Sequence, residues 1–277
     1  YPHVLNRLLP DDIMVLGWAP APNFEFKARF NAESRTYRYY FCRRGMDLAA
    51  MRTAASFLVG AHDYRNFCKM DVTNVKNFRR AIRAVDIIEC QPDDSSRDAM
   101  CYLRVHGTAF LWHQIRCIAS VLFMVGLRQE QPEIVKDLLD IAKIPRKPVY
   151  DIAPALPLIL YESEYLESDL KFRYDVTVLN ILRQRLEYRK AEFDIKAKMT
   201  QGVLDYIDHH IVPVGDTAPL SQSESQLHVS SDFCPARPGM EHIPMDKRQT
   251  CDSYDERVEN LSERKRAVVR RRHGWEL

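Results

Sequence analysis

The sequence predicts an α/β (α+β) fold in which helices flank a largely antiparallel sheet. Two segments, 81–90 and 100–106, alternate like strands, and the polar stretch at 91–98 between them indicates a hairpin. Segments with helical periodicity precede and follow this pair, at 47–59 and 110–126. Strands and helices therefore mix along the chain, and the hairpin makes antiparallel pairing the expectation for the sheet.

The elements before the hairpin follow from local composition. Residues 13–18 form an apolar run, and residues 35–42 (R-T-Y-R-Y-Y-F-C) are rich in aromatic and β-branched side chains, so both are expected to be strands. Residues 47–59 place their apolar side chains on one helical face. Gly60 follows this segment and is expected to be the C-cap of the helix.

The most apolar part of the chain is predicted to be a buried helix. The run at 109–127 has about the length of a membrane span. However, it contains His113, Gln114 and Arg116, and an arginine inside lipid costs several kcal/mol. No membrane segment is expected, and the helix is assigned to residues 110–126.

Composition divides the chain into three parts. A helix beginning at Pro132 and a strand at 156–165 complete a folded domain at 1–168. Residues 169–211 are charged and helix-prone, and are expected to form a helical extension. Residues 212–277 are expected to be a mobile tail, because 212–255 are rich in Pro, Ser, Asp and Gln.

The charged residues and cysteines restrict the protein's class only in part. The net charge of the 277 residues is +2, so the total does not identify a partner. The basic cluster at 264–273 is typical of a nuclear targeting signal or an RNA contact, although it could also be a solvated helix end. The protein is accordingly expected in the nucleus, the cytoplasm or both. Seven scattered cysteines without a C-x-x-C pair argue against a disulfide scaffold or a zinc site.

Several common catalytic motifs are absent from the sequence. It contains no G-x-x-x-x-G-K-[ST], G-x-G-x-x-G, H-E-x-x-H or G-x-S-x-G pattern. The sequence therefore lacks the usual markers of nucleotide hydrolysis, dinucleotide redox chemistry, zinc proteolysis and serine hydrolysis.

The predicted strand at 35–42 carries the first candidate binding residues. Alternation along a strand places Arg35, Tyr37 and Tyr39 on one face. Tyrosine offers a plane on which a base can stack, and arginine pairs with phosphate, so this face suits nucleic acid. The same pattern is also typical of a strand whose aromatic side chains pack in the core.

His62 and Asp63 follow the predicted helix cap, and each has two possible roles. They could form a proton-transfer pair, but adjacent residues of this kind more often fix a loop, and that interpretation is preferred. Asp63 is thus expected to hold the loop after Gly60.

Arg116 is the residue whose position demands an explanation. It lies among apolar residues in the predicted buried helix, and no acidic residue lies within one turn of it. A buried guanidinium must be paired, because an unpaired buried charge costs several kcal/mol. Either Arg116 orients a catalytic carboxylate or a phosphate, or it forms a structural ion pair with a distant part of the chain.

Five motifs follow one another along the chain: F-x-A-R-F at 26–30, R-x-Y-R-Y at 35–39, G-x-H-D-Y/F at 60–64, G-x-A-F-L-x-H-Q-I/V-R at 107–116 and A-P…L-x-L at 153–160. In this order they resemble the tRNA pseudouridine synthase A family, and specifically its eukaryotic branch, which modifies positions 38 and 39 of the tRNA anticodon stem-loop. Each motif is weak alone, but five in register over about 160 residues form a specific match. The resemblance implies a pseudouridine synthase fold, of which this chain is mainly the carboxy-terminal half.

The resemblance also implies a reaction and its residues. The family isomerises uridine to pseudouridine with an aspartate, without a metal or an organic cofactor. Family arginine and tyrosine positions match Arg116, which would pair with the aspartate, and Tyr37, which would lie near the target base. The RNA backbone would be contacted by Arg29, Arg35, Arg79 and Arg80.

Partners and activity are expectations from the same resemblance. The aspartate belongs to a G-R-T-D motif that does not occur in these residues, so the chain is expected to be amino-terminally truncated and inactive alone. The partners would be tRNA and, in a homodimer, a second copy of the chain. Two other hypotheses are a non-catalytic RNA-binding module and a structural domain without a ligand.

Overall fold

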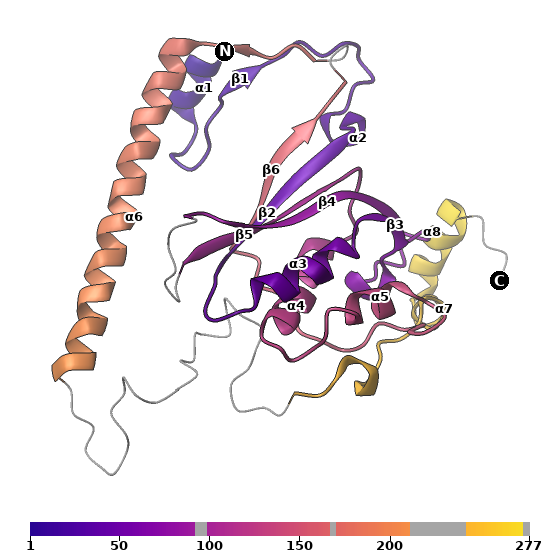
Figure 1. The fold of residues 1–277 in the computed structure, drawn as a ribbon. Coiled ribbons are helices and arrows are strands. Elements are labelled where there is room, and N and C mark those ends of the chain that lie inside the picture. Colours follow the sequence, from indigo (N-terminus) through magenta and orange to yellow (C-terminus); the bar gives the residue numbers. More distant parts are fainter. Residues whose placement is uncertain (92–98, 167–169, 211–241, 274–277) are drawn as a thin grey trace. The chain divides into compact units, whose positions relative to one another are not determined.

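The computed structural model describes residues 1–91, 99–166, 170–210 and 242–273 (Figure 1). The chain divides into two compact units. One combines residues 1–32 and 165–227, and the other combines 33–164 and 228–277. This division differs from the boundaries expected at 168 and 211, because the end of the chain packs with the central part rather than standing apart from it.

The central unit contains a five-stranded sheet in the order β3-β4-β5-β2-β6, with every neighbouring pair antiparallel. Its strands are β2 (Ser34–Cys42), β3 (Gly60–Asp63), β4 (Arg79–Glu89), β5 (Met100–Gly107) and β6 (Leu158–Glu164). Strands β4 and β5 are the predicted hairpin. The prediction of a mixed fold with an antiparallel sheet is confirmed.

Helices cover one face of this sheet (Figure 1). They are α3 (Leu48–Ser56), α4 (Gln114–Gly126) and α5 (Ile134–Leu139), with the short helix η1 (Arg65–Phe67) beside them. Tyr39 and Phe41 of β2 both pack their rings against Phe123 of α4, with centroids 5.8 and 5.1 Å apart. The core therefore lies between the sheet and α4, and twelve of the thirteen residues of α4 are buried.

The other unit contains α1 (Pro2–Leu8), β1 (Gly17–Trp18), α2 (Ala28–Asn31), β7 (Arg173–Tyr174) and α6 (Val176–His210). Strands β1 and β7 pair with each other. Helix α6 lies within the segment expected to be a helical extension, and of its residues only Val178 and Leu182 are buried. Across the described residues, no helix combines the length and the apolar character needed to cross a membrane.

The last described segment contains η2 (Met245–Lys247), α7 (Tyr254–Glu259) and α8 (Glu263–His273). Met245 is buried in the core cluster, and a β-bridge joins Pro148 to Thr250. These residues are packed, in contrast to the mobile stretch that the composition predicts. The rest of that predicted stretch, 212–241, lies outside the described residues.

Candidate functional site

The loop at 108–113 connects β5 to α4 and carries most of the longest sequence motif. It leaves the sheet at Gly107, where a Cβ atom would lie 2.7 Å from the carbonyl oxygen of Ala81. The next residue, Thr108, donates its backbone N–H to that same oxygen at 3.2 Å. A side chain at position 107 would therefore push the loop away from β4, which explains the glycine that begins the motif.

Two of the predicted binding residues on β2 contact this loop. Arg35 donates from Nη1 to the carbonyl oxygen of Thr108 at 2.7 Å. The ring of Tyr37 meets Phe110 edge to face, with centroids 5.2 Å apart. Both side chains are half-buried. The structure thus brings the R-x-Y-R-Y motif and the loop motif together.

Tyr39, on the same face of β2, has a different environment. It is fully buried, and its hydroxyl donates to the carbonyl oxygen of Pro154 at 3.0 Å. Among the residues of this strand face, Tyr39 therefore fits the core interpretation, whereas Arg35 and Tyr37 lie at the edge of the core.

Helix α4 begins later than predicted because the loop needs a left-handed residue before it. His113 has a φ of 59° and is the N-cap residue, so the helix starts at Gln114 rather than at residue 110. The Gln114 side chain accepts a hydrogen bond from the backbone N–H of Leu111 at 2.7 Å. This bond fixes the end of the loop and sets the direction in which the first helical turn presents Arg116.

Arg116 is half-buried and is bound to the backbone rather than to an acid. Its Nε donates to the carbonyl oxygen of Ala153 at 2.5 Å. Within the described residues it forms no ion pair, so the structural ion pair that the sequence left open is not found there. The Nε bond fixes the plane of the guanidinium while the two terminal nitrogens keep their four N–H donors.

The segment at 151–154 is held by three side chains. Besides Arg116, these are Ser120, whose Oγ donates to the carbonyl oxygen of Asp151 at 2.7 Å, and Tyr39. Ser120 is not among the residues predicted from the sequence. Its only signal was a hydroxyl in an otherwise apolar helix, which requires a partner when it is buried.

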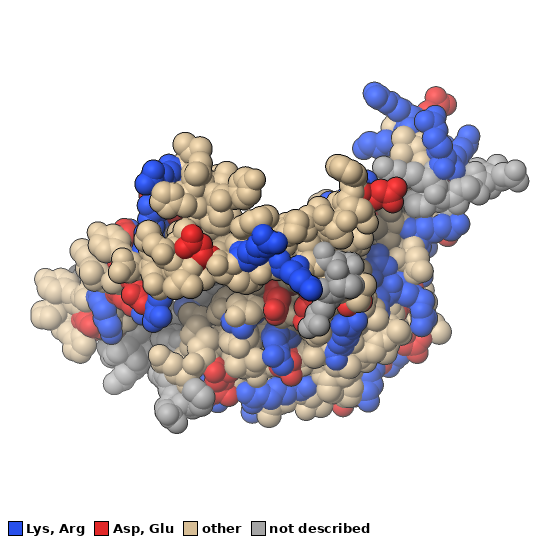
Figure 2. Space-filling model, turned by 90° about the horizontal axis from the view of Figure 1, so that it is seen from above, with Lys and Arg blue, Asp and Glu red and all other residues tan. Residues whose placement is uncertain are grey.

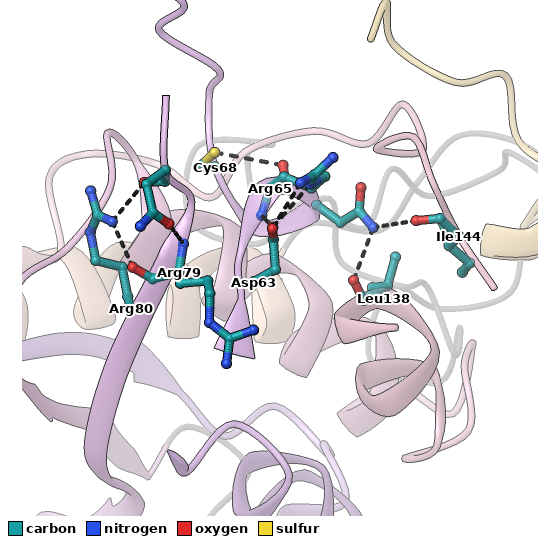
Figure 3. Close-up of polar contacts among 9 residues, drawn as sticks. Asp63, Arg65, Cys68, Arg79, Arg80, Leu138 and Ile144 are labelled. Carbon is teal, nitrogen blue, oxygen red and sulfur yellow. Dashed lines mark hydrogen bonds and ion pairs between the residues drawn. The ribbon is translucent and has the colours of Figure 1, made fainter. Parts of the chain in front are cut away.

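Asp63 and its neighbours form a rigid corner near the start of β4 (Figure 3). The Asp63 carboxylate accepts the backbone N–H of Arg65 at 2.9 Å and pairs with its guanidinium at 2.9 Å. His62 lies 3.0 Å from the carbonyl oxygen of Val59. Both residues of the His-Asp pair are therefore used to hold the loop, as the preferred interpretation predicted.

Asn66 is a structural residue that the sequence analysis missed. It is fully buried, and its side-chain nitrogen donates to the carbonyl oxygens of Leu138 and Ile144 at 2.9 and 2.8 Å (Figure 3). The hydroxyl of Tyr150 donates to the backbone carbonyl of Asn66 at 2.6 Å. These bonds join η1 to α5 and hold the loop beside α4.

Arg79 and Arg80 lie at the first positions of β4, and their side chains leave the strand on opposite sides (Figure 3). Arg79 is exposed and reaches the carbonyl oxygen of Ala61 at 3.3 Å. Arg80 is half-buried and donates to the carbonyl oxygens of Asn77 and Arg79 at 2.8 and 2.7 Å. Burial lowers the pKa of Arg80, and Cys68 opposes that effect in part.

The surroundings of the α4 N-terminus are positively charged. Burial lowers the pKa of His113, and the cations Arg116, Lys69 and Lys147 lower it further. Lys147 donates to the carbonyl oxygen of Cys68 at 2.9 Å. Burial raises the pKa of the Cys68 thiol to about 12, so this cysteine is protonated and unreactive at neutral pH.

Arg29, the remaining predicted contact, lies on α2 in the other compact unit. It is exposed, and its guanidinium lies 5.8 Å from the ring of Phe30. Arg29 and the residues around α4 therefore belong to different compact units.

Known proteins match the part of the chain that builds this site. The family model described as tRNA pseudouridine synthase matches residues 54–166. The tRNA pseudouridine(38/39) synthase of Mus musculus is 36% identical over 96% of this chain, which spans 57% of that protein. The protein of the same name from Saccharomyces cerevisiae is 44% identical over 61% of this chain and 37% of its own length. The tRNA pseudouridine synthase A of Thermococcus kodakarensis is 37% identical over 59% and 56% of the respective chains.

The matched region contains the loop at 108–113, Arg116 and the Ala153 segment that Arg116 binds. The fold, the order of the motifs and the matches over nearly the whole chain agree, and the chain belongs to the tRNA pseudouridine synthase family.

Proposed function

We propose that this chain forms the uridine-binding side of a tRNA pseudouridine synthase that acts on positions 38 and 39 of the anticodon stem-loop. The observation that carries the proposal is the state of Arg116. Its guanidinium is anchored by Nε to Ala153, and among the described residues it has no acidic partner. The names of the mouse and yeast relatives favour positions 38 and 39.

Arg116 would orient the catalytic aspartate. A carboxylate accepts two parallel hydrogen bonds from a guanidinium, which fixes both its position and its direction. The positive charge also keeps the aspartate ionised. The aspartate then acts on the uridine while its glycosidic bond breaks, the uracil turns and a carbon–carbon bond forms. In this scheme the arginine holds the reactive group, and the aspartate comes from sequence outside these 277 residues.

The other predicted residues would bind the RNA. Tyr37 is half-buried at the edge of the core and would lie near the target base, and Arg35 would support it through the loop at 108–113. Phosphates would be contacted by Arg29, Arg79 and Arg80, which are arginines at exposed or half-buried positions. We further propose a homodimer located in the nucleus, the cytoplasm or both.

A second candidate function is a non-catalytic RNA-binding module. It requires only the tyrosine and arginine positions, which are present in these residues. A module of this kind would bind tRNA and leave every uridine unchanged.

Chemical mapping of pseudouridine separates the two functions. The 277-residue chain and a fusion with the part of the mouse relative that it does not match are each incubated with unmodified tRNA. The fusion should form pseudouridine at position 38 or 39, whereas the chain alone should bind without product. A folded fusion that binds tRNA and forms no product would support the non-catalytic module.

A further inference from the structure

Trp112 is the large exposed side chain of the motif at 107–116. Half of its surface, 51%, is accessible, whereas its neighbours Leu111 and Ile115 are 6% and 4% exposed. A large aromatic side chain that stays in water on a well-anchored loop forfeits the stabilisation that burial would give. The loop itself is fixed by Arg35 at one end and by Gln114 at the other.

Lys69 is fastened to this tryptophan from a different part of the chain. Its backbone N–H donates to the carbonyl oxygen of Trp112 at 3.0 Å, and its ammonium lies 4.7 Å from the centre of the indole. Asn66 anchors the loop that carries Lys69. The backbones of both residues are therefore positioned in advance, while the exposed Lys69 side chain can still move.

The charges beside Trp112 are positive. The ring of His113 lies 4.8 Å from the indole. The charges that act on this histidine come from Lys69, Lys147 and Arg116, and all of them oppose its protonation. The acids nearest to Lys69 along the chain are Asp63, which pairs with Arg65, and Asp71, whose carboxylate accepts hydrogen bonds from Thr73 and Asn74. An anion is therefore the favoured occupant of this surface.

We propose that Trp112 and Lys69 form a nucleotide-binding site that is distinct from Arg116, in which an unpaired base of the RNA stacks on the indole and its phosphate binds the ammonium. Single-stranded RNA combines a flat aromatic surface with a negative charge, and stacking on an exposed aromatic ring is the usual way proteins hold it. The Lys69 side chain moves from the ring to the phosphate when the base arrives.

The site would hold a neighbour of the target uridine, and in this respect it rests on the proposed function. Trp112 and Arg116 are four residues apart, so at most about 14 Å of chain separates them. A base that stacks on Trp112 would keep the RNA loop open beside the base that is turned. This role belongs to substrate positioning, because neither Trp112 nor Lys69 would contact the reacting atoms.

Equilibrium binding of the 277-residue chain tests the site directly. The ligands are a short RNA stem-loop with an unpaired loop and the same strand paired throughout to its complement. Trp112→Leu should weaken binding of the stem-loop roughly tenfold and leave binding of the duplex nearly unchanged. Trp112→Phe keeps an aromatic ring and should stay within about threefold of the original chain.

A lysine pair provides the matched control. Lys69→Gln should reduce both the affinity for the stem-loop and the slope of its salt dependence. Lys247→Gln removes the same charge from an exposed position in the same unit and should change little. Circular dichroism confirms that each variant is folded.

Three outcomes would overturn the site. The first is an unchanged stem-loop affinity in folded Trp112→Leu, and the second is an equal loss of affinity for stem-loop and duplex in that variant. The third is that polyglutamate binds the chain as tightly as the stem-loop does and that Trp112→Leu weakens this binding equally, which would indicate an acidic protein partner. A fusion protein that forms no pseudouridine while Trp112→Leu still weakens stem-loop binding would contradict only the proposed function.

Discussion

Tyr37 and Tyr39 show how one strand face can serve two purposes. Both point toward the helices, yet Tyr39 is fully buried beneath α4 and Tyr37 is only half-buried against Phe110. The alternation along a strand predicts the shared face, but the depth of each residue depends on where the covering helix begins. Because α4 starts at Gln114, the end of β2 near Tyr37 is covered by a loop instead.

Two substitutions of Tyr37 distinguish the contribution of its ring to RNA binding from that of its hydroxyl. Tyr37→Phe should leave stability and stem-loop affinity nearly unchanged, because the ring contact with Phe110 remains. Tyr37→Leu removes the stacking surface and should weaken RNA binding about tenfold, as measured by equilibrium titration. Tyr188→Leu, at an exposed position on α6, serves as the control. Equal affinities for Tyr37→Leu and the original chain would contradict a role for Tyr37 near the base.

Asn66 is a single side chain that holds several elements together. Replacing it with Ala would leave the buried carbonyl oxygen of Leu138 and the partly buried carbonyl oxygen of Ile144 without their partner. Each lost buried hydrogen bond costs about 1–3 kcal/mol. Asn66→Ala should therefore lower the free energy of unfolding in urea by several kcal/mol, whereas Asn77→Ala, at an exposed turn, should cost about 1 kcal/mol or less. Similar values for the two variants would contradict the anchoring role.

At the scale of elements, the sequence predicted strands and helices best where periodicity was strong. The hairpin, the strand at 35–42 and the buried helix are all present, because alternating and helical patterns reflect which side faces the core. The helix start was misplaced by four residues. Hydrophobicity continues through the loop at 110–113, but the left-handed conformation of His113 interrupts the helix, and no residue type signals this.

The final segment shows why composition fails locally. Its average is polar, yet Met245 lies in the core cluster, Tyr254 packs against that cluster and Val258 is buried. Thr250 pairs with Pro148, and Glu256 pairs with Arg146 at 3.0 Å. A window average hides single anchors of this kind, because a few well-placed side chains can fix a polar segment.

Helix α8 extends this segment with basic residues. Its sequence is E-R-K-R-A-V-V-R-R-R-H, and a group of Lys and Arg side chains lies over it (Figure 2). The structure places this sequence on a helix in the central unit, and a targeting signal, an RNA contact and a solvated helix end all stay predictions.

At the scale of the whole molecule, charge distribution matters more than the net charge. The total is +2, but Lys69, Arg116 and Lys147 lie around His113 at the start of α4. They come from loops and helices that are far apart in sequence, so a charge count along the chain did not reveal the grouping. The sequence did identify Arg116, because a lone arginine among apolar residues needs a partner. It could not identify Ala153, because a backbone carbonyl leaves no trace in the sequence.

The most direct test of the account compares turnover with affinity for Arg116→Ala in the fusion with the mouse relative. The loss of a group that orients the aspartate should reduce pseudouridine formation by at least about a hundredfold and change the Kd for tRNA by less than about threefold. Arg116→Lys should also be poorly active, since lysine cannot bind Ala153 and a carboxylate in one fixed plane. Arg83→Ala, which removes an exposed arginine of the same sheet, should retain activity. Parallel losses of turnover and affinity in folded Arg116→Ala, or full activity without Arg116, would contradict the account.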